Sequence, residues 1–125
     1  MSNVESYFNL TPGSSTAYAA GQTGFLCWFG AYIGETVTLT RFPKCIVCRI
    51  VMNVATNTVN GDTTFTLRLN GATTGYNVTY AAGETGKKST TVNIIIEEGD
   101  NLSMEMVIGG TAGGITPATG GVHYD

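Results

Sequence analysis

Two short groups of side chains in this sequence are of types that bind metal ions or carry out redox chemistry. The first is Cys45 and Cys48, whose CxxC spacing occurs in zinc sites and thiol–disulfide centres. The residues around the pair alternate between apolar and polar types, as in a strand, where positions i and i+3 face opposite sides. Completing a zinc site would require Cys27 and His123, which are distant in the sequence. We therefore predict reduced, partly buried thiols and no metal or redox site.

The second group contains the acids Glu97, Glu98 and Asp100 around Gly99. Calcium prefers several hard oxygen ligands of this kind, but a solvated turn is the more common role of such a cluster and is the interpretation we favour. His123 is the only histidine in the chain, so acid–base or Ser-His chemistry would have to use it. We interpret His123 as a strand-end residue at a surface or interface. The sequence predicts no catalytic residue, no metal, no cofactor and no enzymatic activity.

The remaining residues alternate with a period of two, which indicates strands. Asn-Gly and Gly-Asp pairs between the alternating segments favour tight turns. Alternation places Ile46, Cys48 and Ile50 on one inward face and Tyr76 and Tyr80 on another. Short strands separated by turns predict an all-β antiparallel sandwich or barrel. The expected strands are Glu35–Phe42, Ile46–Val54, Thr64–Leu69, Tyr76–Tyr80, Thr90–Glu97 and Asn101–Ile108.

The composition excludes several classes of protein. The chain has 125 residues, a net charge of −3 and only 12% charged residues, against about 25% in ordinary soluble domains. Its 42% hydrophobic content is too high for a disordered chain, and it lacks the clustered cations that neutralise nucleic-acid phosphates. The most apolar run, Phe25–Ile33, is far shorter than the ~20 residues of a membrane span. With no basic, signal-like N-terminal segment, synthesis in the cytoplasm is expected.

The few charges are unevenly distributed along the chain. None occurs between Ser6 and Gly34, and none between Met106 and Tyr124 apart from the histidine. Long uncharged segments with aromatic residues are explained by burial, either in the chain's own core or against a neighbouring subunit, and both explanations stay open here. The predicted assembly interface consists of Phe8, Tyr18, Phe25, Trp28, Phe29, Tyr32, His123 and Tyr124.

One part of the sequence resembles a known module. A strand ending in Arg68, Asn70 and Gly71 is followed by a threonine-rich strand and then by an apolar strand ending in Gly99 and Asp100. This pattern resembles the jelly-roll structural module of tailed-phage virion proteins, which is itself likened to the tumour-necrosis-factor and complement C1q sandwiches. The resemblance implies an antiparallel jelly-roll β-sandwich, which we place over residues 23–125. Residues 1–22 depart from the pattern of the module, and we expect them to form an extended N-terminal arm. Asn70, Gly71, Gly99 and Asp100 would be its structural turn residues.

The same resemblance implies a structural role in the virion. The expected function is that of a capsid decoration (cement) protein that binds itself, often as a trimer, and binds the major capsid protein or another virion protein. One alternative is a fibre or tail head that binds a host receptor or glycan, for which Trp28 and Tyr32 are the aromatic candidates. Another is a filament subunit whose segment Ser6–Ala20 completes the sheet of the next copy. Neither nucleic acid nor a membrane is an expected partner.

Overall fold

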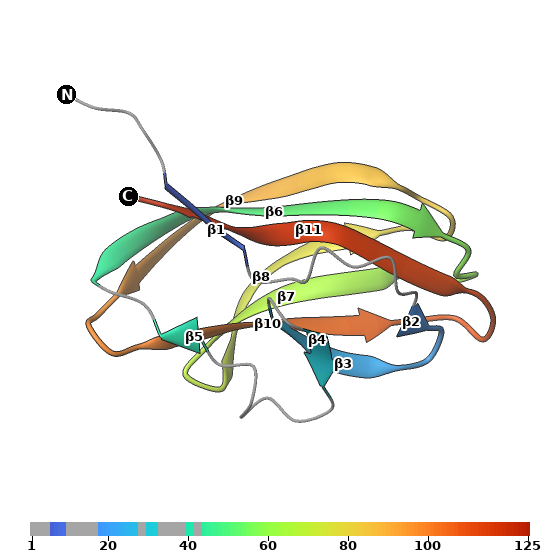
Figure 1. Ribbon diagram of the computed structural model, residues 1–125, viewed down its shortest axis with the longest axis horizontal. Coiled ribbons are helices and arrows are strands. Elements are labelled where there is room, and N and C mark those ends of the chain that lie inside the picture. The colour runs from blue at the N-terminus through green and yellow to red at the C-terminus, as the bar shows by residue number, and fades with distance from the viewer. Residues whose placement is uncertain (1–5, 10–17, 28–29, 33–39, 42–43) are drawn as a thin grey trace.

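The computed structural model describes residues 6–9, 18–27, 30–32, 40–41 and 44–125. Within these residues the chain forms strands joined by turns, and the strands build two antiparallel sheets that face each other (Figure 1). The prediction of an all-β antiparallel β-sandwich is confirmed. The strands are β1 (Ser6–Asn9), β2 (Tyr18–Ala19), β3 (Thr23–Cys27), β4 (Gly30–Tyr32), β5 (Thr40–Arg41), β6 (Cys45–Asn57), β7 (Thr63–Leu69), β8 (Ala72–Tyr80), β9 (Gly86–Ile96), β10 (Asn101–Ile108) and β11 (Gly114–Tyr124).

Strands that are distant in the sequence are neighbours in each sheet. The first sheet has the order β1-β11-β6-β9, and β2 pairs with the beginning of β11. The second sheet has the order β4-β3-β10-β7-β8, and β5 pairs with the beginning of β10. From β6 onward every connection crosses to the opposite sheet except the β7–β8 hairpin.

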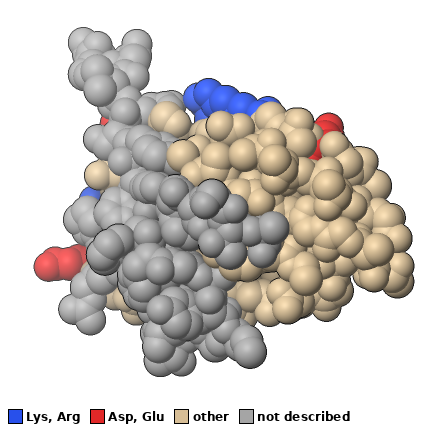
Figure 2. All heavy atoms as spheres, turned by 45° about the vertical axis from the view of Figure 1, so that its right-hand side comes forward, with Lys and Arg blue, Asp and Glu red and all other residues tan. Residues whose placement is uncertain are grey.

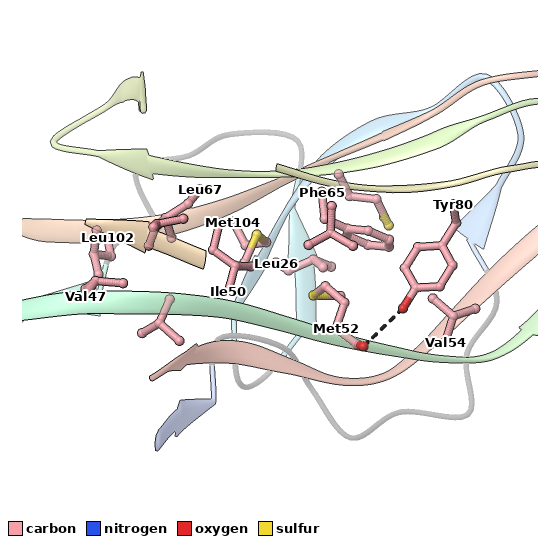
Figure 3. Packing of buried hydrophobic residues seen from close by; sticks show 14 of the residues in the cluster. Leu26, Val47, Ile50, Met52, Val54, Phe65, Leu67, Tyr80, Leu102 and Met104 are labelled. Carbon is pink, nitrogen blue, oxygen red and sulfur yellow. Dashed lines mark hydrogen bonds between the residues drawn. The ribbon is translucent and has the colours of Figure 1, made fainter. Parts of the chain in front are cut away.

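The core lies between the inner faces of the two sheets. Ile50 and Met52 of β6 meet Phe65 and Leu67 of β7 and Met104 of β10, and all five side chains are fully buried (Figure 3). Burial of an aliphatic or aromatic side chain of this size contributes about 1.5–3 kcal/mol. The alternation that predicted β7 and β10 therefore reports their inner faces correctly.

The inward face predicted for β6 is wrong at the beginning of the strand. Ile46 is 46% exposed and Val47 is fully buried, the reverse of the prediction. The cause is a register shift against β11, where His123 pairs with Arg49 but Tyr124 pairs with Val47. Cys48, expected to point inward, is the additional residue of this irregularity and is half-buried. One extra residue reverses the side-chain alternation, and sequence periodicity does not reveal where it falls.

A second irregularity explains why Tyr76 does not point into the core as predicted. Its side chain is 36% exposed, whereas the later inward positions of β8 are buried. On β7, Thr66 pairs with Asn77 and Arg68 pairs with Thr73, so three residues of β8 stand opposite one residue of β7. The extra residues lift Tyr76 away from the inner face.

Parts of the other predictions lie outside the described residues. Of the expected strand Glu35–Phe42, only β5 is described. Of the predicted arm at 1–22, β1 and β2 are described, and both pair with β11 in the first sheet. Across the described ranges, no helix is long and apolar enough to cross a membrane.

Candidate assembly surfaces

The eight residues predicted to form an assembly interface are divided between the two sheets. Phe8 lies in β1, Tyr18 in β2, and His123 and Tyr124 at the end of β11, all in the first sheet. Phe25 and Tyr32 pair with each other across β3 and β4 in the second sheet. Trp28 and Phe29 lie outside the described residues. The interface stays a prediction, and its described members do not form one continuous strand or face.

Several of these side chains already have roles within the chain. Tyr18 and Tyr124 are half-buried and pack against the core. Phe25 is half-buried, and the Arg68 guanidinium lies 5.7 Å from its ring centroid, a distance typical of a cation–π contact. Arg68 also donates a hydrogen bond of 2.5 Å from Nη2 to the Gly71 carbonyl. Burial within the chain's own fold therefore accounts for part of the aromatic content of the uncharged segments.

The outer face of the first sheet carries an apolar pair that the sequence pattern identified only in part. Ile46 of β6 and Ile95 of β9 are cross-strand partners, and their side chains are 46% and 63% exposed. Ile95 lies between the buried Ile94 and Ile96, as strand alternation requires of an outward residue, whereas the irregularity in β6 turns Ile46 outward against the prediction. Directly opposed residues of an antiparallel pair place their Cβ atoms about 5 Å apart. The two side chains, which we call the isoleucine pair, therefore form one apolar spot.

The rest of this outer face combines small polar with basic side chains, since Arg49 is paired with Thr91 and the exposed Lys87 is paired with Asn53. Ser89, Thr91 and Asn93 of β9 are exposed, and Val51 beside Ser89 is half-buried. Figure 2, a side view of the molecule, shows basic atoms grouped along its upper side and a broad described area with few charges below them.

The β8 and β9 edges are tied together by side chains. Lys88 Nζ donates to the Thr79 carbonyl at 2.9 Å, and Thr90 Oγ1 donates to the Asn77 carbonyl at 2.7 Å. Lys88 also forms an ion pair of 2.7 Å with Glu84 Oε1. These bonds occupy β8 carbonyls that an added strand would need, and the lysine places a charge at the edge. Natural sheets use such features to prevent edge-to-edge pairing.

The four predicted turn residues lie together at one end of the sandwich. Asn70 and Gly71 have φ values of 51° and 81°, and Gly99 has a φ of 89°. Two successive positive φ values are those of a type I′ hairpin turn, which Asn-Gly adopts readily. Asn70 Nδ2 donates to Asp100 Oδ1 at 2.9 Å, and Asn70 Oδ1 accepts from the Asn101 amide at 2.8 Å. The β7–β8 turn is thus bonded to the β9–β10 turn, an arrangement we call the turn clasp.

The turn clasp also accounts for the Asp100 carboxylate of the acidic cluster. Asp100 Oδ1 accepts from Asn70, and Asp100 Oδ2 accepts from the Glu97 amide at 2.9 Å. The hydrogen bond from Asn70, followed by that from Glu97, lowers the pKa of the Asp100 carboxyl. Both carboxylate oxygens of Asp100 therefore accept hydrogen bonds that hold the two turns together. In the described ranges, no group of three or more His, Cys, Asp or Glu side chains is arranged to hold a metal ion.

The CxxC cysteines have structural surroundings. Cys45 is half-buried against the core, and burial raises the pKa of its thiol. Cys48 Sγ donates to the His123 carbonyl at 3.3 Å. A raised thiol pKa lowers the thiolate fraction, and the thiolate is the reactive form and the metal ligand.

Comparison of the chain with protein-family models, curated proteins and solved structures found no match to any of them. The proposals below therefore rest on the sequence and on the geometry of the described residues.

Proposed function

We propose that this protein is a structural subunit of a tailed-phage virion, a capsid decoration (cement) protein that binds itself and the capsid. The principal support is the turn clasp, because its residues are the ones that carry the resemblance to the virion module. Asn70, Gly71, Gly99 and Asp100 are far apart in sequence, yet they meet in one hydrogen-bonded arrangement. A motif whose parts meet in space is a stronger signal than the same residues scattered over a fold.

The strand order supports the proposed jelly-roll topology. Consecutive strands from β6 to β11 cross between the sheets at every connection except the β7–β8 hairpin, and β11 lies between β1 and β6. Chains of this kind wind around the sandwich in the manner of two Greek keys. A sandwich whose β8–β9 edge is tied by side-chain hydrogen bonds suits a subunit that must survive in an assembled particle.

The proposed mechanism is accumulation of many weak contacts. A decoration protein presents repeated copies to a repeated lattice, so each contact contributes to avidity without needing high affinity itself. The isoleucine pair on the outer face of the first sheet supplies one such contact surface. The proposed partners are further copies, most simply in a trimer, and a capsid or other virion protein. The proposed location is the virion, after synthesis in the host cytoplasm.

Two measurements test this proposal. Size-exclusion chromatography with light scattering at micromolar concentration is expected to give about three times the 13.1 kDa mass of one chain. Labelled protein is expected to co-sediment with phage particles from cultures that produce it, and negative-stain images should show regularly spaced density on the shell. A monomer that also fails to bind particles would refute the proposal.

A fibre or tail head that binds a host glycan is the second candidate, and the exposure of Tyr76 favours it. An exposed aromatic ring is what sugar stacking requires, and Tyr76 lies on the β8 bulge beside the exposed Asn77. Tyr76→Ala should abolish binding on a glycan array and reduce adsorption if this function is correct. Equal binding by the variant and the unmodified protein would eliminate Tyr76 as the contact.

The filament alternative requires a donor strand from a neighbouring copy. In the described structure β1 pairs with β11 of its own chain, in the register Ser6 to Tyr124 through Asn9 to Gly121. The same register would serve a donated strand. Deleting residues 1–9 should therefore abolish filaments while the sandwich stays folded, and filaments that survive the deletion would refute this alternative.

A further inference from the structure

We infer that Asn70 is a site of spontaneous deamidation, that the turn clasp protects it from this reaction, and that deamidation opens the clasp. The inference goes beyond the proposed function and does not depend on it, because it concerns the chemistry of one turn. The reacting groups are the side-chain amide of Asn70, the backbone nitrogen of Gly71 and water.

The Asn70-Gly71 pair has the groups that deamidation requires. A new C–N bond forms when the Gly71 nitrogen attacks Asn70 Cγ, and the Cγ–Nδ2 bond breaks. The side-chain amide leaves as ammonia and takes the proton of the Gly71 nitrogen with it. Water then opens one of the two C–N bonds of the cyclic imide, which leaves an aspartate or an isoaspartate. Glycine has no Cβ to hinder the approach of its nitrogen, and both residues are exposed to water.

The turn clasp opposes this reaction by binding both polar atoms of the Asn70 side chain. Asn70 Nδ2 donates to Asp100 Oδ1 at 2.9 Å, and Asn70 Oδ1 accepts from the Asn101 amide at 2.8 Å. The Asn70 backbone amide also donates to the Asn101 carbonyl at 2.8 Å. Attack at Cγ expels the nitrogen that binds the Asp100 carboxylate, so the reaction must break that bond. Because hydrogen bonds to charged groups are among the stronger ones in proteins, the clasp should slow deamidation.

The product of the reaction cannot close the clasp again. Deamidation replaces the Nδ2 donor of Asn70 by a carboxylate oxygen, which would face Asp100 Oδ1 at the position where the 2.9 Å bond was made. Two carboxylates at such a distance repel each other. The isoaspartate product also adds a methylene group to the backbone of a two-residue turn. Deamidation of Asn70 should therefore separate the β7–β8 turn from the β9–β10 turn.

A second Asn-Gly pair, Asn60-Gly61, supplies a matched control within the same chain. Asn60 is also exposed, and its side chain is bonded to a different loop. Its Nδ2 donates to Thr111 Oγ1 at 3.1 Å, and its Oδ1 accepts from the Thr111 amide at 2.8 Å. These bonds do not involve Asp100. A substitution at Asp100 should therefore change the reactivity of Asn70 and leave that of Asn60 unchanged.

The test measures deamidation of the folded proteins at neutral pH by tryptic digestion and mass spectrometry. Cleavage after Arg68 places Asn60 and Asn70 in separate peptides. Asp100→Ala should accelerate deamidation of Asn70 about tenfold, equivalent to about 1.4 kcal/mol, with no change at Asn60. Asp100→Asn retains an oxygen acceptor and should react more slowly than Asp100→Ala. In the unmodified chain unfolded in urea, both pairs should react faster than in the folded state.

A second measurement tests the effect of the product. Asn70→Asp reproduces the charge that deamidation creates and should lower the midpoint of urea unfolding. Asn77→Asp adds the same charge at an exposed position of β8, where the Asn77 side chain bonds to Gly75 and Thr79 of its own strand. This control should shift the midpoint less than Asn70→Asp does.

Four results would overturn the inference. Deamidation of Asn70 at the same rate in the folded and the urea-unfolded chain would mean that the clasp gives no protection. An unchanged rate at Asn70 in Asp100→Ala would mean that the carboxylate bond is not the cause of protection. Equal acceleration at Asn60 and Asn70 in Asp100→Ala would assign the change to opening of the whole fold. An unfolding midpoint of Asn70→Asp equal to that of the unmodified chain would mean that the product leaves the clasp closed.

Discussion

Replacing Tyr80 by phenylalanine isolates one buried hydroxyl that joins the two sheets. The Tyr80 side chain is fully buried, and its Oη lies 3.1 Å from the Met52 carbonyl and 2.7 Å from the Gly86 carbonyl (Figure 3 draws the first bond). The ring also contacts Phe65 edge-on at 5.9 Å and lies beneath the Lys88 ammonium at 5.3 Å. Phenylalanine retains both ring contacts, so the variant changes only the hydroxyl.

The expected loss of stability follows from those hydrogen bonds. A buried hydrogen bond contributes about 0.5–1.5 kcal/mol net, and an acceptor left buried without its donor costs about 1–3 kcal/mol. Tyr80→Phe should therefore lower the free energy of unfolding by about 1–3 kcal/mol, measured by urea denaturation followed by circular dichroism. Tyr76→Phe is the control, since Tyr76 is exposed, and its effect should stay within about 0.5 kcal/mol.

The same hydroxyl predicts an alkaline transition. Burial, as the largest cause, raises the pKa of Tyr80 to about 12, against an ordinary value of about 10. The folded state therefore holds this proton more tightly than the unfolded state. The contribution of this pKa difference to the free energy of unfolding is fully present below about pH 10. It is lost as the pH rises through 12, at up to ~1.4 kcal/mol per pH unit. Tyr80→Phe should lack this component between pH 10 and 12.

Two results would refute this reasoning. One is a stability of Tyr80→Phe within about 0.5 kcal/mol of the unmodified chain at pH 7, which would mean that the hydroxyl bonds carry no net energy. The other is an identical decline of both proteins between pH 10 and 12, which would assign the alkaline transition to other groups. A larger loss in Tyr76→Phe than in Tyr80→Phe would contradict the placement of both rings.

Two further predictions concern the turns at the two ends of the sandwich. Gly113→Ala should destabilise the fold by roughly 2–4 kcal/mol in urea denaturation, because the glycine has a φ of 95° and an added Cβ would lie 2.0 Å from the Thr58 carbonyl oxygen. Gly83→Ala, at a φ of 74° with nothing within 4 Å, should cost only about 1–2 kcal/mol, and equal losses would contradict the close packing. Asn70→Gly should raise the depressed pKa of Asp100 toward its ordinary value in a carboxyl NMR titration, and an unchanged titration would refute the assigned cause. Because the pKa of Asp100 is lowered in the folded state, the Asp100 carboxylate stabilises the fold above about pH 4. This stabilisation is lost as the pH falls through the pKa of Asp100 in the folded state. Asn70→Gly should reduce that loss of stability at acid pH.

The fold was predictable where a strand has no bulge, because inward and outward side chains then alternate without interruption. Strands β7 and β10 place every second residue in the core, although Ser103 of β10 is buried as well, and their expected bounds agree with the structure to within one residue. The predictions failed where a strand has an extra residue, at Ile46 in β6 and at Tyr76 in β8. At a bulge, the pairing with the neighbouring strand decides which side chains point inward, and the local sequence does not contain that information.

The candidate surface was only partly predictable for the same reason. Ile95 could be placed on the outer face from its neighbours, but the isoleucine pair exists only because the β6 irregularity turns Ile46 outward. The turn clasp could not be predicted from the sequence either. Asn70-Gly71 and Gly99-Asp100 were recognisable as turns one at a time, yet the bond between Asn70 and Asp100 depends on two turns about 30 residues apart meeting in space.

The uncharged C-terminal segment has an explanation within the fold, and this narrows the case for assembly. β11 lies between β1 and β6 in the first sheet, with Ile115 and Val122 in the core. The segment before β11 needs glycine because it packs closely against the β6–β7 connection. An added Cβ at Gly109 or Gly113 would lie within 2.5 Å of the backbone of that connection. Lack of charge there follows from burial in the chain's own sandwich and needs no neighbouring subunit. The argument for a partner therefore depends on exposed apolar surface such as the isoleucine pair.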